Sequence, residues 1–177
     1  MAKRPRIRLY LAISIDGYIA DNSGGVGWLH PYESEDVGFA DFLTEIDIII
    51  SGRATYEQAL GFGEWPYAGK RVVVLTSRPL EGNPPAGVES YSGDIRQLAA
   101  ILKQDSGRDI WLLGGALVAQ DFLAADLIDT VELYVAPVIL GGGIPLFART
   151  QKSRTLQLTD TRRYNNGIVG LIYKRAG

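Results

Sequence analysis

Three short segments of the 177-residue chain combine small residues with arginine and hydroxyl side chains where buried strands are predicted to end. They read SGRATYE from residue 51, LTSR from residue 75 and LLGGA from residue 112. In an open α/β sheet, ligands bind beside the carboxyl ends of the strands. These segments are therefore the first candidates for a binding site.

Each segment offers what a phosphate group needs. Helix amino-terminal N–H groups carry partial positive charge, and glycine lets an anion approach the main chain. Guanidinium groups hold phosphate oxygens in fork geometry, and hydroxyls add donors. A ligand with several phosphates could use all three segments, through Gly52, Arg53, Thr55, Thr76, Ser77, Arg78, Gly114, Gly115 and Ala116.

The established glycine-rich motifs of nucleotide-binding proteins do not identify the ligand here. The chain has neither G-x-G-x-x-G nor G-x-x-x-x-G-K-[ST] at these positions, so neither motif supports a conventional nucleotide-binding fold. A helix cap or a tight turn is the simpler explanation of each segment taken alone. Their joint occurrence at one edge of a sheet is what favours a dinucleotide.

Predicted strands alternate with predicted helices along most of the chain. We expect strands over 7–17, 47–52, 70–80, 88–92 and from 110 and 129, with helices around 34–45, 53–63, 94–107 and after 115. Two final runs joined through Asn165-Asn166-Gly167 predict a hairpin. The pattern indicates an α/β sandwich, mainly parallel with an antiparallel C-terminal hairpin, as one domain over residues 1–177.

Composition excludes several classes of function. The net charge of −2 argues against a nucleic-acid partner, and the absence of cysteine excludes disulfides and thiolate metal sites. His30 is the sole histidine, so we expect no metal site. No apolar run reaches about 18 residues, which argues against a membrane partner. We therefore expect a cytoplasmic protein that acts on a small molecule.

At these residues the chain resembles the dihydrofolate reductase-like superfamily. More closely, it is similar to the reductase domain of bifunctional riboflavin biosynthesis proteins and its stand-alone relatives. The resemblance covers about residues 7–174 and rests on LAISIDGYIA, ISGRATYE, VVVLTSRP, IWLLGGALVAQDFL and DTVELYVAPVILGGGIPLF. It implies the dihydrofolate reductase-like three-layer α/β/α sandwich, NADPH as cofactor and hydride transfer as chemistry.

The resemblance also implies roles for individual residues. Gly52, Arg53 and Thr55 would meet the pyrophosphate and the adenosine side, and Thr76, Ser77 and Arg78 the 2′-phosphate. Gly114, Gly115, Ala116 and Val118 would wrap the pyrophosphate. Leu11, Ala12 and Ile19 would line the nicotinamide.

The substrate side is less well defined. Dihydrofolate reductases hold the pteridine with one carboxylate on the first helix, and an ungapped placement makes Asp36 that catalytic and substrate-binding residue. Glu33, Glu35 and Asp41 compete with it, and a solvated helix face explains these charges equally well. Trp28 is placed as the family's loop tryptophan in contact with substrate, or as a simple hydrophobic lid.

Three functions remain open. The first is a reductase of the riboflavin-pathway type, acting on a ribosylamine phosphate. However, residues 56–71 lack the basic segment usual for that substrate, since only Lys70 and Arg71 are basic there. The second is a dihydrofolate or other pterin reductase. The third is a non-catalytic NADPH-binding sensor or structural homodimer, for which the apolar Val131-to-Val138 strand would supply an interface.

The 2′-phosphate assignment makes a direct prediction. The wild type should bind NADPH more tightly than NADH, and Arg78→Ala should remove most of that preference, about tenfold or more, because one charge-assisted contact is lost. Titrating both cofactors into both proteins measures it. Equal affinity of the wild type for NADPH and NADH would contradict the assignment.

Overall fold

The protein is described by a computed structural model that covers residues 4–148 and 152–176, so the outermost residues of the domain expected over 1–177 lie outside it. The main sheet contains β1 (Ile7–Ser14), β3 (Ile46–Gly52), β4 (Arg71–Leu75), β5 (Val88–Tyr91), β6 (Asp109–Gly114), β7 (Thr130–Ala136), β9 (Leu156–Arg163) and β10 (Val169–Arg175). A second, two-stranded sheet pairs β2 (Tyr18–Ala20) with β8 (Ile144–Pro145). The helices are the 3₁₀ helix η1 (Gly27–Tyr32), α1 (Phe39–Thr44), α2 (Arg53–Leu60), α3 (Ile95–Asp105) and α4 (Ala116–Ala124).

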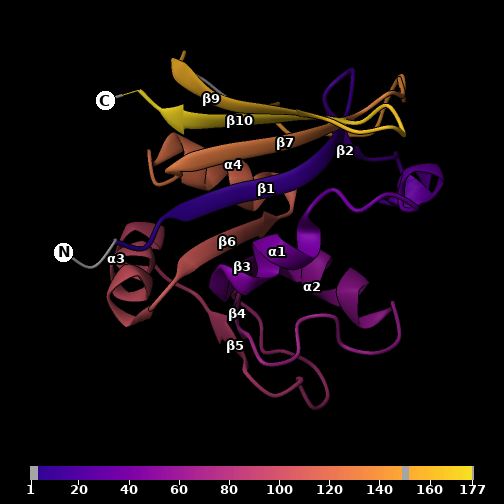
Figure 1. The fold of residues 1–177 in the computed structure, drawn as a ribbon. Helices are drawn as coiled ribbons and strands as arrows, with labels where there is room; N and C mark the ends of the chain where they lie inside the picture. Colours follow the sequence, from indigo (N-terminus) through magenta and orange to yellow (C-terminus); the bar gives the residue numbers. More distant parts are fainter. Residues whose placement is uncertain (1–3, 149–151, 177) are drawn as a thin grey trace.

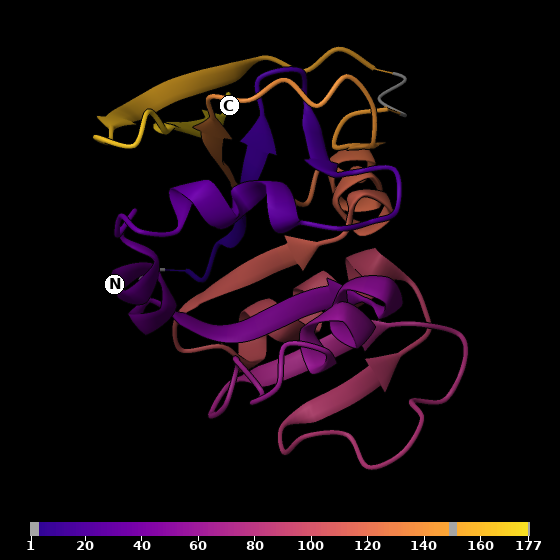
Figure 2. The ribbon, with the colours of Figure 1, turned by 90° about the vertical axis from the view of Figure 1, so that its right-hand side faces the viewer.

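The strand order of the main sheet is β5-β4-β3-β6-β1-β7-β10-β9. Every pair from β5 to β7 is parallel, whereas β10 is antiparallel to both β7 and β9. Helices cover both faces, which gives three layers (Figures 1 and 2). The predicted three-layer sandwich with a mostly parallel sheet and an antiparallel C-terminal hairpin is therefore confirmed.

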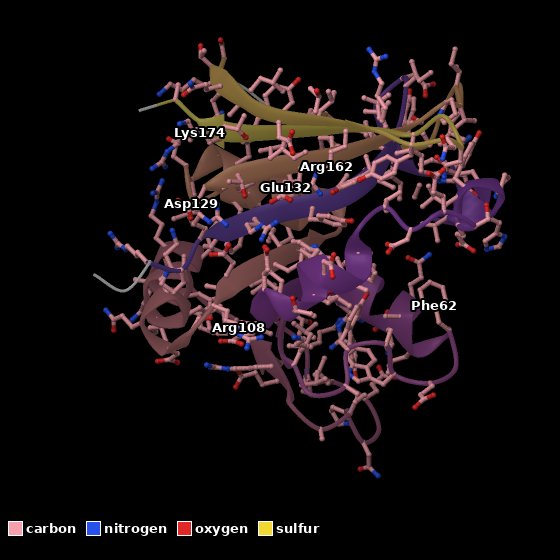
Figure 3. All side chains as sticks on the ribbon, viewed as in Figure 1. Phe62, Arg108, Asp129, Glu132, Arg162 and Lys174 are labelled. Atoms are coloured by element: carbon pink, nitrogen blue, oxygen red, sulfur yellow. The ribbon has the colours of Figure 1, made fainter. Side chains whose placement is uncertain are left out.

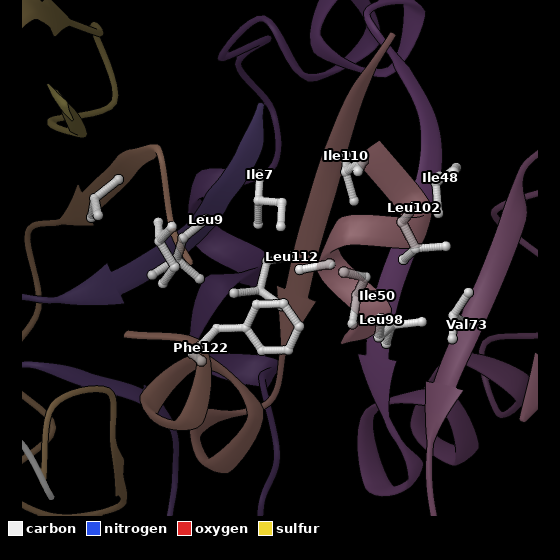
Figure 4. Close-up of a cluster of buried hydrophobic side chains, with 14 of the residues drawn as sticks. Ile7, Leu9, Ile48, Ile50, Val73, Leu98, Leu102, Ile110, Leu112 and Phe122 are labelled. Carbon is white, nitrogen blue, oxygen red and sulfur yellow. The ribbon is translucent and has the colours of Figure 1, made fainter. Parts of the chain in front are cut away.

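The two faces of the sheet are packed differently. On the α3 and α4 side the buried side chains are mainly aliphatic, with Phe122 of α4 filling the space above Leu112 (Figure 4). On the α1 and α2 side the cluster is rich in aromatic rings, including Tyr10, Phe42 and Trp111. The central strands are buried on both faces, which explains their nearly continuous apolar sequences.

The first helix begins later than predicted. The helix expected from Ser34 starts only after Gly38, whose φ of 81° is left-handed and suits glycine. Ser34 lies in a turn, while the Glu35 carboxylate accepts N–H groups from Asn165 and Asn166 in the β9–β10 turn. These tertiary hydrogen bonds hold the segment before α1 against the hairpin, a constraint that local spacing does not reveal.

The chain after β1 forms a strand of its own. Residues 18–20 form β2, which pairs with β8 in the small sheet. Gly143 is required there, because an added Cβ would lie 2.1 Å from the Ala20 carbonyl oxygen. The glycine-rich turn at 141–143 thus brings β8 against β2.

The apolar sequence of β7 has a structural cause that differs from the expected interface. β7 lies between β1 and β10, so both of its edges are hydrogen-bonded within the sheet. Val131 and Tyr134 are buried on its two faces. β7 therefore has no free edge for pairing with a second copy, and the homodimer with an interface along Val131 to Val138 stays a prediction. No helix in the described ranges is both long and apolar enough to cross a bilayer.

A buried ionic network lies near the starts of β1 and β7, where Glu132 faces β1 (Figure 3). The Arg8 guanidinium holds both carboxylate oxygens of Glu132, at 2.6 and 2.8 Å, and also contacts Glu45 and Asp109. The side chains of Arg8 and Glu132 are only 9% and 6% exposed. Burial raises the pKa of Asp109, but hydrogen bonds and charge from Arg6 outweigh it and leave that pKa below its ordinary value.

Removing one member of this network should be costly. Glu132→Leu leaves the Arg8 charge buried beside fewer acceptors and should lower the free energy of unfolding by about 3–5 kcal/mol. The double variant Arg8→Met/Glu132→Leu should recover much of that loss, since no uncompensated charge remains at the pair. Urea unfolding of Glu132→Leu, Arg8→Met and the double variant measures the three free energies of unfolding. A double variant as unstable as the sum of the two single changes would contradict this account.

Candidate functional site

The three candidate segments meet at one edge of the sheet. β3 is paired in parallel with β4 on one side and with β6 on the other, and Gly52 is in register with Leu75 while Ser51 is in register with Gly114. The carboxyl ends of the three strands therefore lie side by side (Figure 2). The expectation that residues 51–57, 75–78 and 112–116 share an edge is confirmed by this register.

Glycine allows the starts of α2 and α4 to touch. A Cβ added to Gly52 would lie 3.1 Å from Val118 Cγ2, and one added to Gly115 would lie 3.1 Å from Thr55 Oγ1. Gly114 differs, because its φ is 106° and no atom lies within 4 Å of an added Cβ. The peptide bond between Gly114 and Gly115 is cis. Gly114 itself is buried, but among the described residues there is free space on its Cβ side, next to the starts of α2 and α4.

Both helix starts lack a side-chain cap. Gly52 and Gly115 are the N-cap residues of α2 and α4, and neither helix has a capping hydrogen bond from a side chain. Ala116 opens α4 and is nearly buried. Two sets of first-turn N–H groups thus point toward the same edge, and such groups attract anions.

The two arginines of the edge have different surroundings. The Arg53 side chain is 11% exposed and donates to Thr76 Oγ1 at 2.9 Å and to the Arg78 carbonyl oxygen at 2.7 Å. Ser77 and Arg78 are exposed, just beyond the end of β4. Positive charge at the surface of this edge therefore comes from Arg78.

The residues expected at the nicotinamide are brought near one another but not onto one face. Leu11 and Ile19 pack against the aliphatic cluster on the α3 and α4 side. Ala12 is the next residue along β1, and side chains alternate between the faces of a strand. A single ring could contact both Leu11 and Ala12 only at the rim of the sheet, so the shared role of these residues stays a prediction.

The structure separates the competing carboxylates. Asp36 is exposed in the loop before α1, not on the helix, and its Oδ1 accepts the Gly38 N–H at 2.7 Å. Glu35 is bound to the hairpin turn, as described above, and Asp41 is exposed on α1. The hairpin turn adjoins the carboxyl end of β7, so the segment that contains Asp36 lies on the β7 and β10 side of the sheet. Its catalytic and substrate-binding role stays a prediction.

Aromatic side chains form the wall on the α2 side. Trp65 packs edge-on against Tyr56 and Tyr67, with ring centroids 5.8 and 5.1 Å away, and Tyr67 in turn contacts Trp111. Burial raises the pKa of Tyr67 to about 12, so this phenol is neutral at physiological pH. Trp65 and Tyr67 thus pack against the α1 and α2 face of the sheet.

Besides the Tyr10 hydroxyl, three polar atoms on this side of the sheet have no hydrogen-bond partner among the described residues. They are the indole nitrogens of Trp28 and Trp65 and the hydroxyl of Tyr56, and all three are buried. Buried polar groups are normally satisfied, so such atoms mark places where a ligand or water completes the structure. Sequence reasoning missed Tyr56, although its place next to Thr55 could have suggested it.

Asp16 is a second residue that sequence reasoning missed. Its carboxylate accepts hydrogen bonds from Ser14 Oγ at 2.6 Å and from the N–H groups of Leu140 and Gly141, at 3.1 and 2.7 Å. The bond from Ser14 is the main cause of a pKa below the ordinary value for Asp16. This residue ties the end of β1 to the loop before β8 and so fixes the rim expected to hold the nicotinamide.

Fold and edge together define a dihydrofolate reductase-like α/β protein. The crystal structure of dihydrofolate reductase from Enterococcus faecalis, complexed with NADP(H) and RAB-propyl, matches over the whole of both chains with a TM-score of 0.72, although only 20% of residues are identical. The sequence profile of the RibD C-terminal domain matches residues 5–170, and the chain belongs to that family.

Two relatives match along nearly their entire length. The Bacillus subtilis protein YwjB is 38% identical over 170 residues, which cover 95% of this chain and 97% of YwjB. The crystal structure of a putative riboflavin biosynthesis protein from Shewanella sp. PV-4 has a TM-score of 0.87 and 30% identity, covering 97% of this chain and 99% of that one. Both matches therefore span nearly the whole of this chain and of the relative.

The contact between α2 and α4 can be tested directly. Gly52→Ala should lower the free energy of unfolding by about 1–3 kcal/mol, because the new methyl group crowds Val118. Adding Val118→Ala makes room for that methyl group and should make the double variant more stable than the sum of its single changes predicts. Urea unfolding of the single and double variants measures the coupling. Strictly additive effects would show that the two residues do not pack together.

Proposed function

We propose that the protein is an NADPH-dependent reductase of the riboflavin-biosynthesis type. It would transfer a hydride from NADPH to a small heterocyclic or ribosylamine substrate. The observation that carries the proposal is the convergence of the ends of β4, β3 and β6 at one edge, with two helix starts that have no side-chain cap among the described residues and free space on the Cβ side of Gly114. Membership of the RibD C-terminal domain family supports the same chemistry.

The residues present fit an extended dinucleotide. The pyrophosphate would lie on the main chain at Gly114 and Gly115, where the first turns of α2 and α4 meet and an added Cβ on Gly114 would find open space. The 2′-phosphate would lie beyond β4, beside Ser77 and Arg78. NADPH, when bound, supplies the hydride. The protein contributes position and electrostatics, because hydride transfer depends mainly on alignment.

The groups available to a substrate include buried, uncharged hydrogen-bond donors. The indole N–H groups of Trp28 and Trp65 could donate to carbonyl oxygens or ring nitrogens of a heterocycle. Asp36 is the proposed carboxylate for the donor edge of that ring. It would hold the ring in place relative to the nicotinamide.

A specific observation favours a second candidate substrate, an uncharged heterocycle such as a pterin. The Lys70 ammonium donates to the carbonyl oxygens of Leu43 and Ile46, at 2.8 and 2.6 Å. Arg71 is paired with Glu89 and Asp105 at the start of β4, away from the candidate edge. Both basic residues of the segment 56–71 are thus engaged within the fold, which leaves neither to hold a ribose phosphate.

Turnover tests the proposal. NADPH oxidation, followed by its near-ultraviolet absorbance, should be seen with a member of a panel of aminopyrimidine ribosylamine phosphates, their dephosphorylated forms and dihydropterins. Asp36→Asn should lower the rate with that substrate at least about tenfold, because it removes the carboxylate charge. The affinity of this variant for NADPH should stay within about twofold of the wild-type affinity, because the proposed partner of Asp36 is the substrate and not the cofactor.

The control is Asp121→Asn, which removes an exposed carboxylate on α4 that is not a candidate for the substrate carboxylate. Its rate should equal that of the wild type. Tight NADPH binding without turnover on any substrate would favour the sensor hypothesis over catalysis. Failure of the wild type to bind NADPH would overturn the proposed function altogether.

A further inference from the structure

The arginine that opens α2 is directed into the protein. All three nitrogens of the Arg53 guanidinium are engaged: Nε with Thr76 Oγ1 at 2.9 Å, Nη1 with Glu57 Oε1 at 3.0 Å, and Nη2 with the carbonyl oxygens of Arg78 and Pro79. Three of these acceptors belong to the loop after β4. Arg53 therefore fastens that loop to the start of α2.

Thr76 is also used within the fold. Its hydroxyl accepts from Arg53 Nε and from the Arg78 N–H, the latter at 3.2 Å, and it donates to the Arg78 carbonyl oxygen at 3.2 Å. The hydroxyl proton thus has an acceptor within the loop. The Arg53 fork and the Thr76 turn together set the direction in which the chain leaves β4.

The side chain of Arg78, unlike that of Arg53, is not used to hold the fold together. It is exposed, and within residues 4–148 and 152–176 its side chain makes no hydrogen bond or ion pair. Its backbone, in contrast, is held at both the N–H and the carbonyl oxygen. Ser77 is likewise exposed between these fixed points. A rigid main chain therefore presents one unpaired guanidinium and one free hydroxyl.

We propose that Arg53 is a positioning residue, and that selectivity for the 2′-phosphate arises from Arg78 and Ser77, which Arg53 holds in place. The inference rests on the proposed function and revises the direct phosphate contact that the family resemblance implies for Arg53. To ligate phosphate itself, Arg53 would have to leave the carbonyl oxygens of Arg78 and Pro79, and the loop after β4 would lose that attachment to α2.

Charge supports the same division of roles. Glu57 is paired with Arg53 one helical turn along α2, so a phosphate that approached Arg53 would meet a carboxylate beside it. Arg78 has no such neighbouring acid in an ion pair. Among the two arginines of the edge, only Arg78 offers an uncompensated charge to an anion.

The test compares the ratio of NADPH to NADH affinity in Arg53→Gln, Arg53→Lys, Arg78→Gln and the double variant Arg53→Gln/Arg78→Gln. Arg78→Gln should lower the ratio about 10- to 100-fold through loss of a charge-assisted contact. Arg53→Gln should lower it about tenfold by releasing the loop. Arg53→Lys should behave like Arg53→Gln within about threefold, because lysine keeps the charge but not the fork.

The double variant distinguishes the two roles. If Arg53 acts through Arg78, then Arg53→Gln should change the ratio by less than about twofold once Arg78 is already glutamine. A full further loss in the double variant, or an Arg53→Lys variant with the wild-type ratio, would overturn the inference and make Arg53 a direct ligand. A purely structural defect would lower both affinities together and leave the ratio unchanged, which would also overturn it.

The charge control is Arg71→Gln. Arg71 lies at the other end of β4, in ion pairs with Glu89 and Asp105, and its loss should leave the affinity ratio within about twofold of the wild type. If the wild type does not bind NADPH, the proposed function is wrong. If the wild type prefers NADPH to NADH but the Arg53 and Arg78 substitutions change the affinity ratio independently of each other, only this inference is wrong.

Discussion

The close approach of two helix starts at the edge of a parallel sheet is the constraint on which the site depends. Gly52 and Gly115 stand where any larger residue would crowd Val118 or Thr55 across the gap. Because these positions lack side chains, the first turns of α2 and α4 lie against each other and free space remains on the Cβ side of Gly114. The edge is therefore a property of backbone packing, which explains why its sequence is poor in side chains that do chemistry themselves.

The two halves of the edge are built by different means. The half at β4, β3 and β6 is formed from strand ends and the helices that directly follow them, so short local segments determine it. The half near β1 and β7 depends on distant loops. Tyr164 donates to the Val37 carbonyl oxygen, and Asp16 holds the loop before β8. A half built from local segments is thus joined to a half whose shape depends on contacts between distant loops.

This difference determines how much could be predicted from sequence. The buried runs of β3 and β6 and the Asp94 cap of α3, which accepts N–H groups from Arg96 and Gln97, follow from local pattern, and so does the sheet edge they imply. The late start of α1 does not, because it depends on hydrogen bonds to a hairpin far along the chain. Nor does the inward direction of Arg53, since its acceptors are main-chain groups of another loop. The apolar sequence of β7 indicated burial correctly but not which neighbour provides it.

A crystal structure of the protein soaked with NADPH tests the central claim most directly. The account predicts density for the diphosphate on the main chain between Gly114 and Ala116, with the adenosine phosphate beside Ser77 and Arg78. Density for the dinucleotide on another surface, or a soaked crystal with ordered protein and no bound dinucleotide at millimolar concentration, would contradict it.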